Sequence, residues 1–341
     1  MLGALTLPLL AGVYNFGWRT AVMAIVAMSA CWAAEYAFTR KEGKPASMAA
    51  LVTGALLTLT CPPNVPFWQI IVGSAFAIVF GKMVFGGFGR NIFNPTMVGR
   101  CFIYISFPIT IAATWFVPFQ GGVAGFAQYS PDGQTMKARD VEASLYNLDG
   151  VTSATVLSTT KKQNLLARDA LEKKDQGGYD KLAASFNSVD RTRLLLGNIN
   201  GSIGETCKIL ILVALVFLLY TKIAAVPLAI GPLVGLFVAK AVLYGLGVEV
   251  MPFGQALYIG VFGGGTLFAI TFMTTEPVSA PVNNTARWIY GILIGFAATM
   301  IRSLSAFNAG FMFAIMLGNT FGPIIEIAVE RLEKARKGAT P

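Results

Sequence analysis

A short hydroxyl-rich string lies near the middle of the chain and reads Asp149-Gly150-Val151-Thr152-Ser153-Ala154-Thr155. An Asp-Gly pair followed by serine and threonine is ordinary turn chemistry, because Asp side chains bond to nearby backbone and glycine accepts left-handed conformations. Taken alone, these residues indicate a loop that displays hydroxyl groups.

Four carboxylates lie inside or beside long apolar runs and could bind a cation: Glu35, Glu205, Glu276 and Glu326. A charged group in such a setting is expensive unless it is paired or used, so these residues are candidates for a Na⁺ or proton pathway. Glu276 stands beside Pro277, at an expected helix break where freed backbone carbonyls can also coordinate a cation. We therefore prefer Glu276 among the four.

Glu35 and Glu326 have a plainer interpretation. Both lie close to the ends of their apolar runs. Long side chains at such ends can reach the membrane interface or pair with a neighbouring arginine, here Arg40 or Arg331. We expect this interfacial role for the two residues.

Other chemistry-bearing residue types exclude several classes of site. The chain has no histidine, and its cysteines stand singly, far from any Cys-x-x-Cys spacing, as Cys31, Cys61, Cys101 and Cys207. We therefore expect no metal site in this chain, whether zinc, haem or a complete iron–sulfur cluster. The glycine runs 86–89 and 263–265 lack the strand context and the Lys-Ser/Thr ending of a phosphate loop, so they indicate close helix packing and helix breaks.

The composition is that of a lipid-embedded protein. Of 341 residues, 55% are hydrophobic and 13% are charged, and the apolar residues come in long unbroken runs. A run of about 20 apolar residues spans the hydrocarbon core as a helix. The net charge of +9 comes from short basic stretches between these runs, which the positive-inside rule explains, so we expect no nucleic-acid binding.

The apolar runs predict an all-α integral membrane protein of about ten transmembrane helices. Their expected ranges are 1–16, 20–38, 48–62, 66–86, 96–118, 206–221, 224–246, 256–274, 286–302 and 306–329. Basic residues in alternate connections, among them Arg40, Lys82 and Arg287, place those connections and both termini in the cytoplasm.

The same parity places the long hydrophilic segment outside the cytoplasm. We expect four regions: a first five-helix membrane repeat over 1–118, an extracytoplasmic loop over 119–205, a second five-helix membrane repeat over 206–329 and a cytoplasmic tail over 330–341. The hydroxyl-rich string lies within the extracytoplasmic loop.

Two short similarities indicate an internal repeat with broken helices. Residues 59–66 (LTCPPNVP) resemble 274–281 (TTEPVSAP), and residues 93–95 (FNP) resemble 307–309 (FNA). Halves of five helices each must have opposite orientations, which is the inverted-repeat plan of many transporters. The second half opens with residues 201–206 (GSIGET), whose counterpart would fall before residue 1, so we expect the N-terminus to be clipped.

Several ordered motifs resemble one membrane-protein family over nearly the whole chain. They are residues 86–95 (GGFGRNIFNP), 201–205 (GSIGE), 275–279 (TEPVS) and 288–291 (WIYG). Together they look like the hallmark of NqrB and RnfD, homologous membrane subunits of the sodium-pumping NADH:quinone oxidoreductase and of the Rnf ferredoxin:NAD oxidoreductase. The hydroxyl-rich string resembles the signal at which a flavin transferase of this family esterifies FMN phosphate onto the last threonine.

The resemblance implies that Thr155 carries FMN through a phosphoester. The other residues of the signal, which the transferase would read or which leave room for the phosphate and ring, are Asp149, Gly150, Thr152, Ser153 and Ala154. The chain would then be an electron-transfer subunit of an ion-translocating oxidoreductase in the bacterial inner membrane, not catalytic alone. A non-covalent riboflavin, an FMN-bearing neighbouring subunit and a pair of iron–sulfur membrane subunits are further implied cofactors and partners.

Between the two homologues, the short connection from Arg40 to Ser47 and residues 13–18 (VYNFGW) favour the Rnf D subunit. The NqrB type is the alternative. The chain departs from the family at residues 45–49 (PASMA), where members often have an acidic residue before the third helix. The choice between Na⁺ and H⁺, the electron donor and acceptor, and quinone binding stay open.

Two other classes also stay open. A flavin-free inverted-repeat channel or secondary transporter shares the helix plan but does not need the hydroxyl-rich string. A structural scaffold for other redox subunits fits an unmodified Thr155. Fluorescence of the denatured polypeptide would separate flavin-carrying from flavin-free classes.

Overall fold

The structure is a computed structural model that describes residues 1–108, 110–111, 118–119, 123–130, 156–186, 191–305, 309–336 and 338. All regular elements in these residues are helical, which confirms the predicted all-α class. The first half contains α1 (Leu2–Phe16), α2 (Arg19–Thr39), η1 (Arg40–Glu42), α3 (Met48–Thr60), α4 (Phe67–Ile78), η2 (Val79–Met83) and α5 (Pro95–Ser106). The hydrophilic segment contains α6 (Ala124–Ala127), α8 (Val156–Glu172), α9 (Gln176–Phe186) and α10 (Arg191–Leu196).

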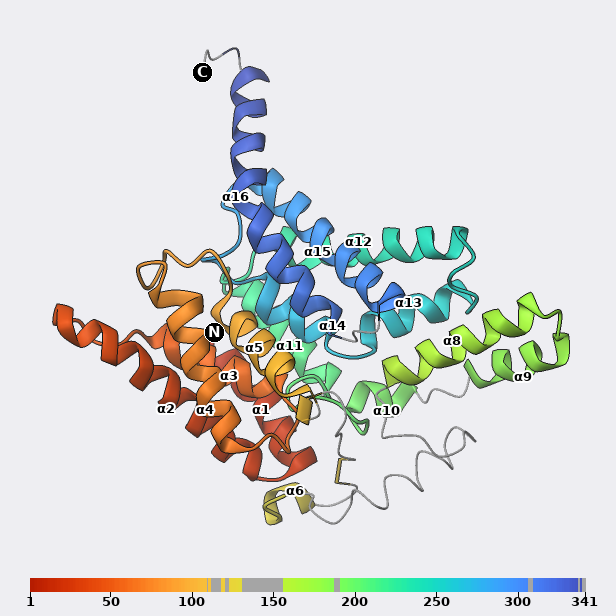
Figure 1. Cartoon of the computed structure of the whole chain (residues 1–341), viewed down its shortest axis with the longest axis horizontal. Coiled ribbons are helices and arrows are strands. Elements are labelled where there is room, and N and C mark those ends of the chain that lie inside the picture. The colour runs from red at the N-terminus through yellow and green to blue at the C-terminus, as the bar shows by residue number, and fades with distance from the viewer. Residues whose placement is uncertain are drawn as a thin grey trace.

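The second half contains α11 (Lys208–Tyr220), α12 (Val226–Gly245), α13 (Phe253–Phe262), α14 (Thr266–Phe268), η4 (Ala269–Thr274), α15 (Asn284–Leu304) and α16 (Gly310–Arg336). In Figure 1 the two halves form neighbouring groups, and α8 and α9 extend to one side. The helix α16 carries the chain away from the body towards its C-terminus.

Several helices have the length and composition of membrane spans. Three described helices, α2, α12 and α16, are long and apolar enough to cross a membrane, and the bent pair formed by α13 and α14–η4 is a fourth if counted as one span. Shorter apolar helices are α1, α3, α4 with η2, and α11. The chain is therefore a multi-pass membrane protein, while its predicted orientation stays a prediction.

Two predicted helices differ from the structure. The range 256–274 is not one helix, because it breaks between α13 and α14 with a bend of 57° at the glycine run 263–265. Within the range expected as one helix over 96–118, α5 ends at Ser106, and helical backbone is described again at residues 108 and 110–111. Phe107 interrupts it, because a residue before proline is disfavoured in the α region.

A side-chain cap fixes the start of α5, and short backbone contacts link the end of α3 to the segment before α11. The side chain of Asn94 caps α5 by accepting from the backbone N–H groups of Thr96 at 3.0 Å and Met97 at 3.3 Å, and Pro95 occupies the first turn. The backbone N–H of Gly204 donates to Leu59 O at 2.8 Å, and that of Ile203 donates to Cys61 O at 3.1 Å. The stretch before α11 is thus fixed to the end of α3.

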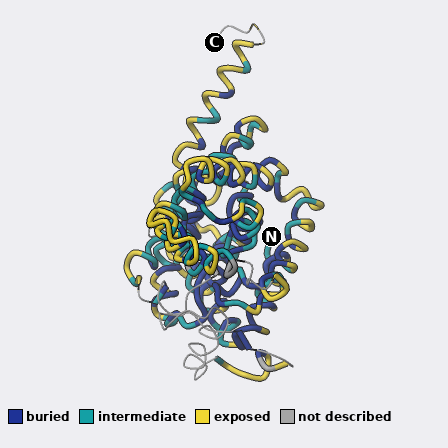
Figure 2. The backbone as a smooth tube through the Cα atoms, turned by 90° about the vertical axis from the view of Figure 1, so that its right-hand side faces the viewer, coloured by how far each residue is buried: buried dark blue, intermediate teal, exposed yellow. Residues whose placement is uncertain are grey.

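Burial follows from this packing. Figure 2 shows buried segments gathered in the middle of the molecule and a largely exposed C-terminal end of α16. One large apolar cluster runs through both halves and includes Leu57, Met97, Phe272 and Ile294. Many large apolar side chains on the outer helix faces, such as Val216 and Phe237, are exposed, which suits a surface that contacts lipid or other membrane subunits.

Glycines allow α12 and α15 to approach closely. A Cβ on Gly295 would overlap the carbonyl oxygen of Pro232, and one on Gly235 would overlap that of Ile292. We expect Gly295→Ala to destabilise the protein by about 1–3 kcal/mol, because the two backbones must separate. The thermal midpoint in detergent would measure this loss. Gly245→Ala is the matched control, since a Cβ there meets nothing within 4 Å, and an equal loss in both variants would contradict the expectation.

Candidate functional site

A central cavity lies where the two halves and the hydrophilic segment meet. It is lined by Leu59, Thr60, Met97, Arg100, Tyr104, Ile111, Leu157, Glu205, Gly264, Gly265, Phe268, Ala269, Met273, Arg302, Ala309, Phe311, Met312 and Ile315. Most of these side chains are apolar or aromatic, and a few charged groups converge among them. A mostly apolar cavity with a few placed polar groups is the usual form of a cofactor or ligand site.

Two arginines supply the positive charge of the cavity. Arg100 lies on α5 and donates through Nη1 to the backbone oxygen of Thr60. Arg302 lies near the end of α15, donates through Nη1 to Thr266 Oγ1 at 2.5 Å and stands 4.8 Å over the ring of Phe311. Within the described residues, the buried Nε–H of each arginine has no hydrogen-bond partner. Each guanidinium therefore has one buried N–H that no described residue accepts.

Glu205 is the acidic group of this cavity. Its Oε1 accepts from the backbone N–H of Ser202 at 2.9 Å. A Cβ on Gly265 would overlap its Oε2, so the glycine run at the α13–α14 break leaves room for the carboxylate. Beside it, the buried ammonium of Lys208 donates to Gly264 O at 2.8 Å and to the backbone oxygen of Glu205. The predicted candidate Glu205 thus reaches the central cavity.

The predicted flavin-attachment string, Asp149 to Thr155, lies outside the described residues. The described chain resumes at Val156, the first residue of α8, and Leu157 lines the central cavity. Two residues of chain span at most about 7 Å. A group bonded to Thr155 is therefore tethered within reach of the cavity wall.

The cavity suits a flavin by the chemistry of its lining. A flavin ring is flat and largely apolar, with carbonyl oxygens and ring nitrogens that accept hydrogen bonds. Phe268, Phe311 and Met312 supply apolar walls, and the unpaired Nε–H groups of Arg100 and Arg302 supply donors. The residues present therefore fit such a group.

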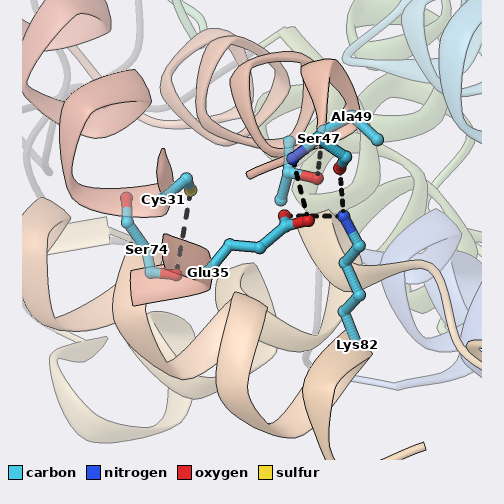
Figure 3. A network of polar contacts seen from close by, with 7 residues as sticks. Cys31, Glu35, Ser47, Ala49, Ser74 and Lys82 are labelled. Atoms are coloured by element: carbon cyan, nitrogen blue, oxygen red, sulfur yellow. Dashed lines mark hydrogen bonds and ion pairs between the residues drawn. The ribbon is translucent and has the colours of Figure 1, made fainter. Parts of the chain in front are cut away.

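Glu35 lies in a buried polar network, as Figure 3 shows. The Lys82 ammonium donates to Glu35 Oε2 at 2.7 Å and to Ser47 Oγ at 2.7 Å, and the backbone N–H of Ser47 donates to Glu35 Oε1 at 3.1 Å. The Lys82 and Glu35 side chains are only 2% and 3% exposed. The expected pairing with Arg40 is therefore wrong, because the carboxylate turns inward, where η2 and the start of α3 satisfy it.

This network also bears on two sequence observations. Ser47 precedes α3, where relatives of the resembled family often have an acidic residue, and here its hydroxyl and N–H bind the pair instead. Lys82 helped to set the predicted topology, yet it is a buried member of the π-helical turn η2. The Lys82 ammonium therefore pairs with Glu35 inside the protein and does not lie at the surface.

Glu276 lies in the connection between η4 and α15, and Glu326 of α16 contacts the end of that connection. Glu276 Oε2 accepts from Ser279 Oγ at 2.8 Å. Both oxygens of Glu326 bind the backbone just before α15, accepting from the N–H of Val282 at 2.9 Å and of Asn283 at 2.8 Å. Glu326 therefore fixes the start of α15. Within the described residues it has no ion pair with Arg331, contrary to the expected pairing.

A second cavity and a second buried ion pair were not predicted. Lys240 Nζ of α12 lies 2.5 Å from Glu249 Oε2, and both side chains line a cavity between α8, α12, α13 and α15. Leu157 and Arg302 line both cavities. The basic residues Arg100, Lys240 and Arg302 also lie in apolar runs of the sequence. A charge in such a run is a candidate functional residue whatever its sign, so the sequence carries the same signal for these three residues as for the carboxylates.

The helices and cavities define a multi-pass helical membrane protein with a charged cavity between its halves. A family model described as the NQR2, RnfD, RnfE family matches residues 1–333. The chain belongs to this family, as its motifs predicted.

Several curated relatives are each named as the B subunit of a Na(+)-translocating NADH-quinone reductase. The chain is 35% identical to that of Azotobacter vinelandii over 277 residues, which are 81% of this chain and 58% of the relative. It is 32% identical to that of Chromohalobacter salexigens over 294 residues, 86% of this chain and 61% of the relative. It is 32% identical to that of Pseudoalteromonas atlantica over 310 residues, 90% of this chain and 65% of the relative. The chain thus spans less than two thirds of the length of these relatives.

Proposed function

We propose that this chain is the NqrB-type membrane component of a Na⁺-translocating NADH–quinone reductase, with FMN bonded to Thr155 and electrons passing through the central cavity. The observation that carries the proposal is the cavity itself, which is lined by Arg100, Arg302 and Leu157, two residues after Thr155. The chain would act only within a multisubunit oxidoreductase.

The relatives favour this assignment over the Rnf type. The short connection from Arg40 to Ser47 pointed to the Rnf D subunit, but the relatives from Azotobacter, Chromohalobacter and Pseudoalteromonas are named as B subunits of the quinone reductase. They support the alternative better. Other subunits, including an FMN-bearing neighbour, an iron–sulfur pair and the maturing flavin transferase, are partners that the proposal implies.

The residues of the cavity would bind and tune the flavin. When bound, FMN would supply the electron-transfer chemistry. Arg100 and Arg302 would donate to the ring's acceptor atoms and stabilise negative charge on it. Phe268 and Phe311 would keep water away, which strengthens these charge interactions. The phosphate on Thr155 would lie at the N-terminal end of α8, where the helix dipole favours an anion.

An ion pathway is the second part of the proposal. Glu205 has one oxygen beside the α13–α14 break, and Glu276 has one oxygen with a hydroxyl partner. These two carboxylates are the proposed cation ligands, because broken helices expose carbonyls that can complete a Na⁺ site. Glu35 and Glu326 are better explained by their own backbone and lysine contacts.

The proposed architecture is two inverted five-helix repeats. In the first half α2 packs on α4 and α4 packs on α5, and in the second half α12 packs on α15 and α15 on α16. The same order of packing in both halves supports the repeat. An inverted repeat also suits the competing class, a flavin-free channel or transporter. The presence or absence of bound flavin therefore distinguishes the redox subunit from the channel or transporter.

Peptide mass spectrometry of the protein from its own membranes tests the flavin. The peptide that contains Thr155 is expected to carry the added mass of FMN, and the denatured protein should fluoresce on a gel. A bare Thr155 in cells that contain the flavin transferase would overturn the redox role and favour the transporter or scaffold class.

Removing the charge of Arg302 should make the bound flavin harder to reduce. A unit charge about 10 Å away contributes roughly 1–2 kcal/mol at an effective dielectric constant of 20, so Arg302→Gln should lower the two-electron midpoint potential by about 30 mV. Arg302→Lys keeps the positive charge, so its midpoint potential should lie close to that of the parent protein. Redox titration of the flavin in the purified complex measures the shift.

The control for that titration is Arg168→Gln. Arg168 lies on α8 and forms an exposed pair with Glu172 at 3.1 Å. Its loss removes the same charge without touching the cavity. Equal shifts for Arg168→Gln and Arg302→Gln would contradict a role for Arg302 in the cavity.

A further inference from the structure

The helix α8 presents one face to the second half of the protein. Leu157, Lys161, Asn164 and Ala167 recur at helical spacing along this face. Ala167 packs with Met251, Ala256 and Ile259 in a small apolar cluster. Leu157 of α8 and Tyr179 and Leu182 of α9 pack against the same cluster. The polar contacts of α8 add directional links to the second half.

Asn164 forms two hydrogen bonds to the connection between α12 and α13. Its Nδ2 donates to Val248 O at 3.0 Å, and its Oδ1 accepts from the backbone N–H of Val250 at 3.0 Å. The residue between these two partners is Glu249, whose carboxylate pairs with Lys240 at 2.5 Å. One side chain of α8 thus fixes both backbone neighbours of a buried carboxylate.

Lys161 forms hydrogen bonds to the C-terminal end of α15. Its ammonium donates to the backbone oxygen of Arg302 at 2.9 Å and to that of Ser305. These carbonyls lie at the C-terminal end of the helix, where a cation is favoured. Partial burial lowers the pKa of Lys161, a cost that the two carbonyl partners offset. The residue it holds, Arg302, is the one whose guanidinium lines the central cavity.

We propose that Lys161 and Asn164 are positioning residues that clamp α8 onto the second half and so hold the group on Thr155 at the central cavity. This inference rests on the proposed function. Thr155 directly precedes α8, so any lift or roll of the helix moves the attachment point. Electron transfer slows steeply with distance, and a tether on an undocked helix would leave the flavin at variable distances from the cavity.

Hydrogen–deuterium exchange of the assembled complex in lipid nanodiscs tests the clamp independently of the flavin. Asn164→Ala and Lys161→Ala should each speed exchange of the α8 amides by about tenfold, because each removes hydrogen bonds to backbone groups. Lys162→Ala is the matched control, since Lys162 is exposed on the other side of the same helix. Lys161→Arg should restore slow exchange.

The same samples give two further measurements, the midpoint potential of the flavin and the mass of the Thr155 peptide. The proposal expects the alanine variants to keep FMN on Thr155 but to shift its potential and slow its reduction, while Lys162→Ala changes neither. Unchanged α8 exchange, or faster exchange with an unaltered flavin potential and reduction rate, would overturn the clamp alone. A bare Thr155 in the parent protein would overturn the proposed function together with the positioning role.

Discussion

Replacing Thr155 by valine is expected to remove the covalent flavin completely. Valine keeps the branched shape but has no hydroxyl to form the phosphoester, so flavin per chain should fall from stoichiometric to undetectable. Fluorescence of the denatured band and the mass of the peptide containing position 155 measure this. Quinone reduction by the complex should fall to background, because no side chain replaces the cofactor.

The neighbouring hydroxyls provide the control for this change. Thr152→Val and Ser153→Ala keep the Thr155 hydroxyl, and Thr155→Ser keeps a hydroxyl at the attachment position. Retention of bound flavin in Thr155→Val, or its transfer to residue 152 or 153, would contradict the assignment. Equal loss in all variants would show that the string is read as a whole, so Thr155→Ser is the decisive comparison.

The second large effect is expected at the buried Glu35–Lys82 pair. Lys82→Met should destabilise the protein by about 3–5 kcal/mol, because it leaves a buried carboxylate without its cation. The double variant Glu35→Gln/Lys82→Met should recover most of the stability, since no buried charge is then unpaired. Thermal unfolding in detergent, followed by gel filtration, measures both.

Lys41→Met is the control for the buried pair. Lys41 lies in the exposed turn after α2, and surface substitutions usually change stability by less than about 0.5 kcal/mol. The prediction would be wrong if Lys82→Met were as stable as Lys41→Met. A double variant as unstable as the single one would show that Ser47 and the π-helical turn need the charges themselves.

Thr155 and Lys82 belong to separate parts of the molecule. Thr155→Val removes the cofactor attachment and should leave the fold intact, whereas Lys82→Met disturbs the packing of α2, α3 and η2. Loss of function in the first should therefore occur without a change in thermal midpoint. Loss in the second should follow the loss of folded protein.

The sequence by itself determined the helical membrane class, most helix ranges and the family. Long apolar runs, the glycine run 263–265 and the motif at 93–95 are properties of contiguous residues, and local physics acts on them directly. Asn94 illustrates this, since its capping role follows from its place just before a proline-led helix. The ranges 256–274 and 96–118 are each expected as one helix, and each is interrupted, the first at a glycine run and the second at the residue before a proline.

Only the tertiary structure decided which charges meet. Glu35 finds Lys82 rather than Arg40, and Glu326 finds the backbone before α15 rather than Arg331. Arg100, Arg302 and Leu157 come from three distant segments and become neighbours at one cavity. Sequence spacing does not encode such distances, because a buried charge is satisfied by whichever partner the packed helices bring to it.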